Sequence, residues 1–133
     1  MKPFLSYLIL AGIFLILDLI WLGLVANSFY RSALGPLMAD QINVPAAVAF
    51  YLLYVVGVMV FVVSPALEAG GWWRALTMGA FFGLVAYGTY DLTNLAVTRG
   101  FPLSVALVDM AWGATLTAIA AALTVILTQR FVG

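Results

Sequence analysis

The sequence contains no cysteine and no histidine, and only 8% of its 133 residues are charged. The absence of cysteine excludes disulfides, thiol catalysis and zinc–thiolate sites. The absence of histidine argues against the histidine-rich kind of membrane di-iron chemistry, and removes the side chain that normally changes charge near neutral pH. The sequence also shows no haem or nucleotide-binding motif. Five basic and five acidic residues give a formal net charge of zero, which predicts no nucleic-acid partner.

Apolar residues, in contrast, are abundant: they make up 66% of the chain, and the mean hydropathy is +1.19. Soluble domains carry roughly a quarter charged residues, so this chain could not cover the surface of a soluble domain with polar side chains. Several apolar runs exceed the ~18 residues that indicate a transmembrane helix. The sequence therefore predicts an all-α, polytopic membrane protein.

We expect four transmembrane helices, at approximately residues 4–25, 45–63, 75–97 and 102–127. Residues 1–133 would form a single membrane domain, and the short second and third connections predict an antiparallel bundle. The longer connection, residues 26–44, is expected to be either a short helix on the membrane surface or a plain connector. The first apolar run is longer than a signal peptide and has no A-x-A site, so we expect a retained first helix.

The orientation in the membrane follows from the positions of lysine and arginine. Four spans place both termini on one side of the membrane, together with Lys2, Arg74 and Arg130. Arg31 and Arg99 lie on the opposite side. Three basic residues against two favour termini in the cytoplasm.

Three aspartates interrupt the predicted spans at similar depth. Asp18 and Asp91 lie seven and six residues before the predicted ends of the first and third spans, and Asp109 lies seven residues after the predicted start of the fourth. The first and third spans end on the face at which the fourth begins. At 1.5 Å per residue, each carboxyl group is then about 10 Å below that face.

Aromatic and polar residues are predicted to share this layer. Trp21 and Trp112 each follow an aspartate by three residues, so each D-x-x-W pair shares a helix face. The second and third spans contribute further residues, those of the third at helical spacing: Tyr51 and Tyr54, then Gly83, Tyr87, Asp91 and Asn94.

An ionisable residue in the hydrocarbon region costs a few kcal/mol and normally faces the bundle interior or a water-filled cavity. We therefore expect three buried aspartates. No lysine or arginine lies within a predicted span, so the cluster is either partly protonated or accompanied by a cation, and its protons would be lost in coupled steps. The alternative is purely structural, because such residues also join helices by hydrogen bonds of about 0.6 kcal/mol each.

Three functions are compatible with this cluster. In the first, the protein binds, and if it is an enzyme modifies, a membrane lipid or a small amphipathic ligand. The polar or catalytic core would be Asp18, Asp91 and Asp109, and the ligand-binding residues would be Asn94, Trp21, Trp112, Tyr51, Tyr54 and Tyr87. In the second, the same aspartates hold a divalent cation such as Mg²⁺, Ca²⁺ or Mn²⁺ in a membrane enzyme. In the third, the chain is a proton-coupled small transporter that works as a homodimer, although transporter sites usually lie nearer the midplane.

Five motifs occur in the order LDLIWLG, FYLLYVVG, PALEAG, YDLTNLA and VDMAWGA. In this order and spacing they resemble an uncharacterised bacterial membrane family, the domain of unknown function 2177, over nearly the whole chain. The resemblance implies a small multi-pass protein of the bacterial inner membrane, with no established activity. It also implies an association with genes for fatty-acyl modification, which favours a lipid as the ligand.

Overall fold

The computed structural model describes residues 2–21, 23 and 44–131. The predicted connection at residues 26–44, which includes Arg31, lies outside the described residues except for Val44. Within the described part, the regular structure is entirely helical, which confirms the all-α prediction. The elements are α1 (Lys2–Trp21), α3 (Val44–Val58), the π-helical segment η3 (Met59–Val63), α4 (Ser64–Glu68), α5 (Gly71–Val97) and α6 (Leu103–Phe131).

Among the described residues, three helical segments are long and apolar enough to cross a membrane: Pro3–Trp21, Val44–Glu68 and Leu103–Phe131. The third predicted span, residues 75–97, lies within α5. This helix has 27 residues, which is sufficient length, but its glycine, threonine, tyrosine, aspartate and asparagine residues lower its hydropathy. The fourth crossing of the membrane therefore stays a prediction.

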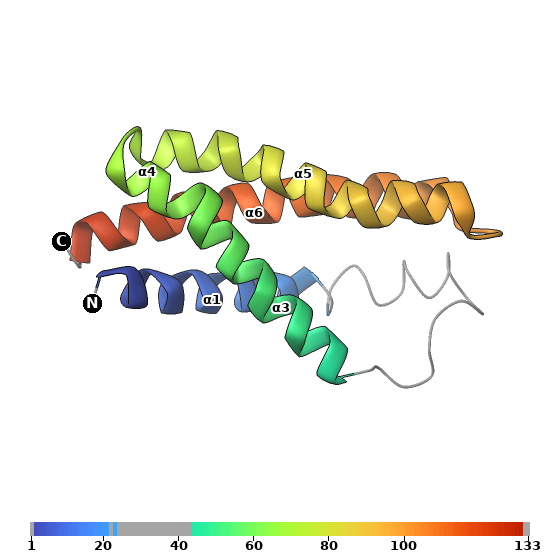
Figure 1. The fold of residues 1–133 in the computed structure, drawn as a ribbon, viewed down its shortest axis with the longest axis horizontal. Helices are drawn as coiled ribbons and strands as arrows, with labels where there is room; N and C mark the ends of the chain where they lie inside the picture. The colour runs from blue at the N-terminus through green and yellow to red at the C-terminus, as the bar shows by residue number, and fades with distance from the viewer. Residues whose placement is uncertain (1, 22, 24–43, 132–133) are drawn as a thin grey trace.

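Figure 1 shows how the helices are arranged. The helices α5 and α6 run antiparallel side by side, and α6 also packs against α1. The beginning of α1 and the end of α6 lie at the same end of the molecule, which we call the terminal end (Figure 1). The helix α3 crosses the others obliquely, and its first residues diverge from the rest of the bundle (Figure 1). Accordingly, every residue from Val44 to Phe50 is exposed.

The close approach of α5 and α6 depends on glycine. A Cβ atom added to Gly83 would lie 2.2 Å from the carbonyl oxygen of Gly113, and one added to Gly79 would lie 2.9 Å from the carbonyl oxygen of Thr117. Small residues four apart let two membrane helices come into backbone contact. The sequence GAFFG, in which Gly79 and Gly83 are four residues apart, thus allows α5 to lie directly on α6.

The segment η3 immediately precedes Ser64 and Pro65. Proline has no N–H group to donate to the carbonyl oxygen four residues earlier, here that of Phe61. The helix widens at this point, and the N–H group of Ser64 donates to the carbonyl oxygen of Met59, five residues before it. Wide turns of this kind are a recognised way of accommodating a local break in a helix.

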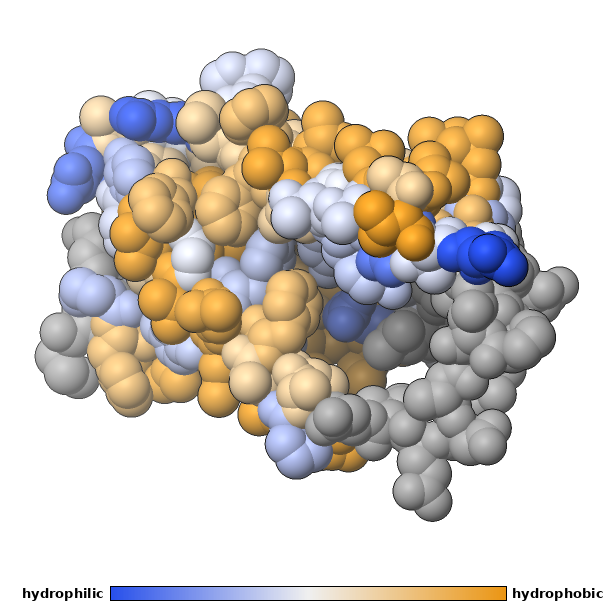
Figure 2. Space-filling view, turned by 45° about the vertical axis from the view of Figure 1, so that its right-hand side comes forward, coloured by the Kyte–Doolittle hydropathy of each residue, from blue (hydrophilic) through white to orange (hydrophobic). Residues whose placement is uncertain are grey.

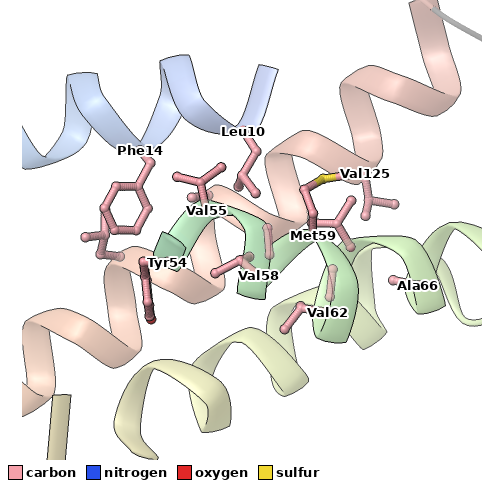
Figure 3. Close-up of a cluster of buried hydrophobic side chains, with 14 residues drawn as sticks. Leu10, Phe14, Tyr54, Val55, Val58, Met59, Val62, Ala66 and Val125 are labelled. Carbon is pink, nitrogen blue, oxygen red and sulfur yellow. The ribbon is translucent and has the colours of Figure 1, made fainter. Parts of the chain in front are cut away.

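The apolar core is formed by side chains of α1, α3, η3, α4, α5 and α6 (Figure 3). Its side chains include Phe14 and Leu10 of α1, Val58 of α3 and Val125 of α6, all nearly inaccessible. Near the terminal end, the hydroxyl groups of Ser6 and Thr128 form a buried hydrogen bond of 3.0 Å between α1 and α6. The core therefore fixes one part of the bundle, and the aspartates lie beyond it.

The outer surface is largely apolar. Many large apolar side chains are exposed on every long helix, among them Leu19, Leu53, Phe81 and Leu107. Figure 2 shows broad orange areas on the face turned forward, with strongly hydrophilic residues confined to a few places. A soluble monomer rarely exposes such a surface, whereas the hydrocarbon of a membrane would solvate it.

Candidate functional site

The two predicted D-x-x-W pairs meet between α1 and α6. The rings of Trp21 and Trp112 are stacked, with centroids 4.4 Å apart and planes inclined by 6°. The indole nitrogen of Trp112 donates a long hydrogen bond of 3.4 Å to the Asp18 carboxyl group. The antiparallel arrangement of α1 and α6 thus places the aspartate of one pair beside the tryptophan of the other.

The third aspartate, Asp109, connects the cluster. Its carboxyl group acts electrostatically on both Asp18 of α1 and Asp91 of α5. The three residues that the sequence places at one depth therefore lie within electrostatic range in a chain, with Asp109 of α6 between the other two. Within the described residues, no group of three or more acidic side chains is arranged to hold a metal ion.

The prediction of three buried aspartates is wrong for two of them. Asp91 is fully buried, with 0% of its surface exposed, whereas Asp18 and Asp109 are only partly buried. The reason lies in the path of α3, whose first residues diverge from the bundle at this end. This helix therefore covers the carboxyl groups of α1 and α6 less fully than it would if it packed against the bundle along its whole length.

Asp91 is exceptional in its surroundings. Among the described residues, neither of its carboxyl oxygens has a hydrogen bond of normal geometry, although its carboxyl group is close enough to that of Asp109 for a side-chain hydrogen bond and an electrostatic interaction. A buried polar group without a partner costs free energy. Such a group in a folded protein therefore calls for an explanation beyond stability.

The tyrosines of the layer mainly connect helices. The Tyr51 hydroxyl donates to the carbonyl oxygen of Ala11, and the Tyr54 hydroxyl shares a hydrogen bond of 2.8 Å with that of Thr117. The ring of Tyr87 lies against Gly113, with its centroid 5.9 Å from that of Tyr54. Tyr51 and Tyr54 thus use their hydroxyl groups in contacts between α3 and its neighbours.

Asn94 is engaged within its own helix. Its amide nitrogen donates to the carbonyl oxygen of Tyr90 at 2.9 Å, and its amide oxygen accepts a hydrogen bond of 2.8 Å from the Thr98 hydroxyl. These contacts stabilise the last turn of α5. The predicted role of Asn94 in orienting a ligand stays a prediction.

A hollow with a volume of about 320 Å³ lies beside the cluster, and we call it the carboxylate hollow. Its lining comes from α3, α5 and α6: Phe50, Ala86, Tyr87, Tyr90 and Asp109. Sequence reasoning identified Tyr87 and Asp109 but missed the other three. Tyr90 directly precedes Asp91, and Phe50 directly precedes Tyr51. Both residues therefore lie within named motifs, YDLTNLA and FYLLYVVG.

The hydrogen bond between Trp112 and Asp18 can be measured by a double-mutant cycle. Trp112→Phe removes the N–H donor and keeps an aromatic ring against Trp21, while Asp18→Asn weakens the acceptor. We expect a coupling free energy of about 0.6 kcal/mol, the average for hydrogen bonds between membrane helices. The measurement is the free energy of unfolding in mixed micelles. Equal effects of Trp112→Phe in both backgrounds would show that the contact contributes no stability.

The helical architecture and the apolar surface define an integral membrane protein of the all-α class. The chain belongs to the family described as "Predicted membrane protein (DUF2177)", whose family model matches residues 3–126. The matched region includes all three aspartates of the cluster. No curated protein and no solved structure matches the chain.

Proposed function

We propose that the protein binds a membrane lipid or a small amphipathic molecule, with the polar group of the ligand held at the carboxylate hollow. The observation that carries this proposal is Asp91, a fully buried carboxyl group that has no hydrogen bond of normal geometry among the described residues and whose side-chain neighbour is a second carboxyl group. Asp91 interacts electrostatically with Asp109, and Asp109 lines the hollow. A ligand group bound there would bring a hydrogen-bond donor to a site where two carboxyl groups otherwise interact with each other.

The chemistry of the cluster favours a ligand that donates hydrogen bonds. An ionised carboxylate only accepts them, and a protonated one still has acceptor capacity. The basic residues Lys2, Arg31, Arg74, Arg99 and Arg130 all lie outside the predicted spans. An amine or a hydroxyl group would therefore complement the aspartates, and an amine would also compensate their charge.

The other walls of the hollow suit the apolar part of such a ligand. Phe50 and Tyr90 offer aromatic surface that is about half exposed, and Ala86 leaves space between them because its side chain is small. Ligand pockets are commonly lined in this way, by apolar and aromatic side chains with a few polar groups that fix the orientation. With the termini in the bacterial cytoplasm, as the basic residues predict, the hollow would open in the outer half of the inner membrane.

The test is native mass spectrometry of the gently extracted protein. We expect the wild type to retain a lipid mass, and Asp109→Asn to retain it about tenfold less or weaker still, because a hydrogen bond to a charged group contributes about 1.5–3 kcal/mol. The matched control is Glu68→Gln, which makes the same chemical change in the exposed last residue of α4. Equal retention of lipid by all three proteins would refute the proposal.

Two further measurements separate the other two functions from lipid binding. A proton-coupled transporter, active as a homodimer, would show substrate uptake into proteoliposomes that depends on the pH gradient. A divalent-metal enzyme would lose stability when a chelator is added. A lipid-binding site of the proposed kind would show neither effect.

A further inference from the structure

Two further hollows adjoin the carboxylate hollow on the surface of the bundle. A second hollow, of about 340 Å³, shares Phe50 with it and is lined by α3, η3 and α5. A third, of about 320 Å³, shares Phe61 and Phe82 with the second and lies between η3 and α5. Together they form a series along the seam between α3–η3 and α5, which we call the α3–α5 groove.

The groove is polar at one end only. Asp109 lines the carboxylate hollow, whereas the second and third hollows are lined almost entirely by apolar side chains, such as Leu53, Val60 and Met78. The groove thus has the polarity of a lipid, with one polar end and a long apolar remainder. Carboxyl groups at the polar end complement a donor group such as an amine, as argued above.

The length of the groove also fits an acyl chain. Along α5 it extends from Tyr90 to Met78, which are twelve residues apart. At 1.5 Å per residue this distance is about 18 Å. The hydrocarbon core of a bilayer is about 30 Å thick, so the acyl chains of one leaflet occupy about half of that thickness. The groove is therefore about as long as one such chain.

The groove results from the oblique path of α3 (Figure 1). The two helices make aromatic contacts where Tyr54 meets Phe82, with ring centroids 5.5 Å apart. At Gly57, an added Cβ atom would lie 3.2 Å from the ring of Phe82, so the glycine keeps this crossing close. On the outer side of these contacts, the diverging helices leave the seam open to apolar molecules.

We propose that an acyl chain of the ligand lies along the α3–α5 groove, with its polar end at Asp109. This inference rests on the proposed function, and it adds the class of ligand and its direction of access. The ligand is a single-chain lipid, or one chain of a larger lipid, that carries an amine or hydroxyl group near its polar end. It reaches the site sideways from the membrane, between α3 and α5.

The experiment uses the whole protein in phosphatidylcholine vesicles that contain hexadecylamine with a diazirine at the end of its chain. After illumination, labelled peptides are located by mass spectrometry. We expect labels to concentrate on η3 and the first half of α5, around Phe61, Met78 and Phe81, which line the third hollow. Labels spread evenly over the exposed apolar residues of α1 and α6 would overturn the inference.

Two neighbouring substitutions provide the matched comparison. Leu53→Trp enlarges a side chain that lines the second hollow, and we expect it to reduce labelling of the third hollow several-fold. Leu52→Trp makes the same change beside it, outside the lining, and should leave labelling unchanged. Both leucines are exposed, by 72% and 49%, so neither change disturbs the core.

Asp109→Asn distinguishes the inference from the function on which it rests. If it reduces labelling and Leu53→Trp does not, the polar end is bound as proposed but the chain lies elsewhere, and only the groove is refuted. If neither substitution reduces labelling, the probe merely solvates the protein, and both proposals fail. Reduction by both, with Leu52→Trp unchanged, supports both.

Discussion

Gly83→Ala is expected to lower the free energy of unfolding by about 3 kcal/mol, at the upper end of the range for overpacking a close contact. The added Cβ atom would lie 2.2 Å from the carbonyl oxygen of Gly113 and 2.8 Å from its carbonyl carbon. These are backbone atoms in the middle of a helix, so they cannot rotate away as a side chain could. Relief of the clash requires α5 and α6 to separate along their shared surface, which is the most extensive contact between helices in the described structure.

The measurement is unfolding in mixed micelles, followed by circular dichroism, with Gly12→Ala as the control. Gly12 is also helical, but no atom lies within 4 Å of the position of its added Cβ. The control should therefore stay within about 1 kcal/mol of the wild type, which is the difference in helix propensity between glycine and alanine. A loss of the same size in both variants would mean that the α5–α6 contact is looser than the structure indicates.

The α5–α6 contact also positions the candidate site. Gly79, Gly83, Tyr87 and Asp91 follow one another at intervals of four residues and so lie on one face of α5. Because the two glycines rest against α6, the ring of Tyr87 lies on Gly113, and Asp91 comes close to Asp109. Packing in the middle of the bundle thus determines the distance between the two carboxyl groups near its end.

Much of this arrangement is predictable from the sequence, because it depends on spacing along regular helices. Long apolar runs predict the helices, and antiparallel connections place Asp18, Asp91 and Asp109 at one depth. The D-x-x-W spacing predicts that Trp21 and Trp112 share faces with their aspartates, and the structure brings the two tryptophans into a stack. These conclusions require only the rise and the periodicity of a helix.

The remainder depends on how the helices cross, which spacing does not determine. The oblique path of α3 is a feature of how the helices pack against one another (Figure 1). It leaves Asp18 and Asp109 partly exposed, and it brings Phe50 to the carboxylate hollow. The cross-helix hydrogen bond of Tyr54 could not be foreseen either, because it requires the register between α3 and α6.

Removing the Asp91 carboxyl group is expected to lower the free energy of unfolding if the residue is structural, and to raise it if the residue is functional. Asp91→Val should raise the free energy of unfolding of the ligand-free protein by about 1–3 kcal/mol. The substitution removes a buried carboxyl group that has no hydrogen bond of normal geometry among the described residues and that lies beside a second carboxyl group, and leaving a buried polar group unsatisfied costs about that much. The same variant should lose the bound lipid, as proteins often keep destabilising residues at sites of function.

The matched control is Thr117→Val, which also replaces a buried polar side chain with valine. The Thr117 hydroxyl shares a hydrogen bond of 2.8 Å with a neutral partner, the Tyr54 hydroxyl, so its removal should lower stability by about 0.6 kcal/mol. The two substitutions are thus expected to change the free energy of unfolding in opposite directions in the same mixed-micelle experiment. If Asp91→Val also lowers the free energy of unfolding, Asp91 stabilises the packing of helices as Thr117 does. The main argument for a binding site at the cluster would then fail.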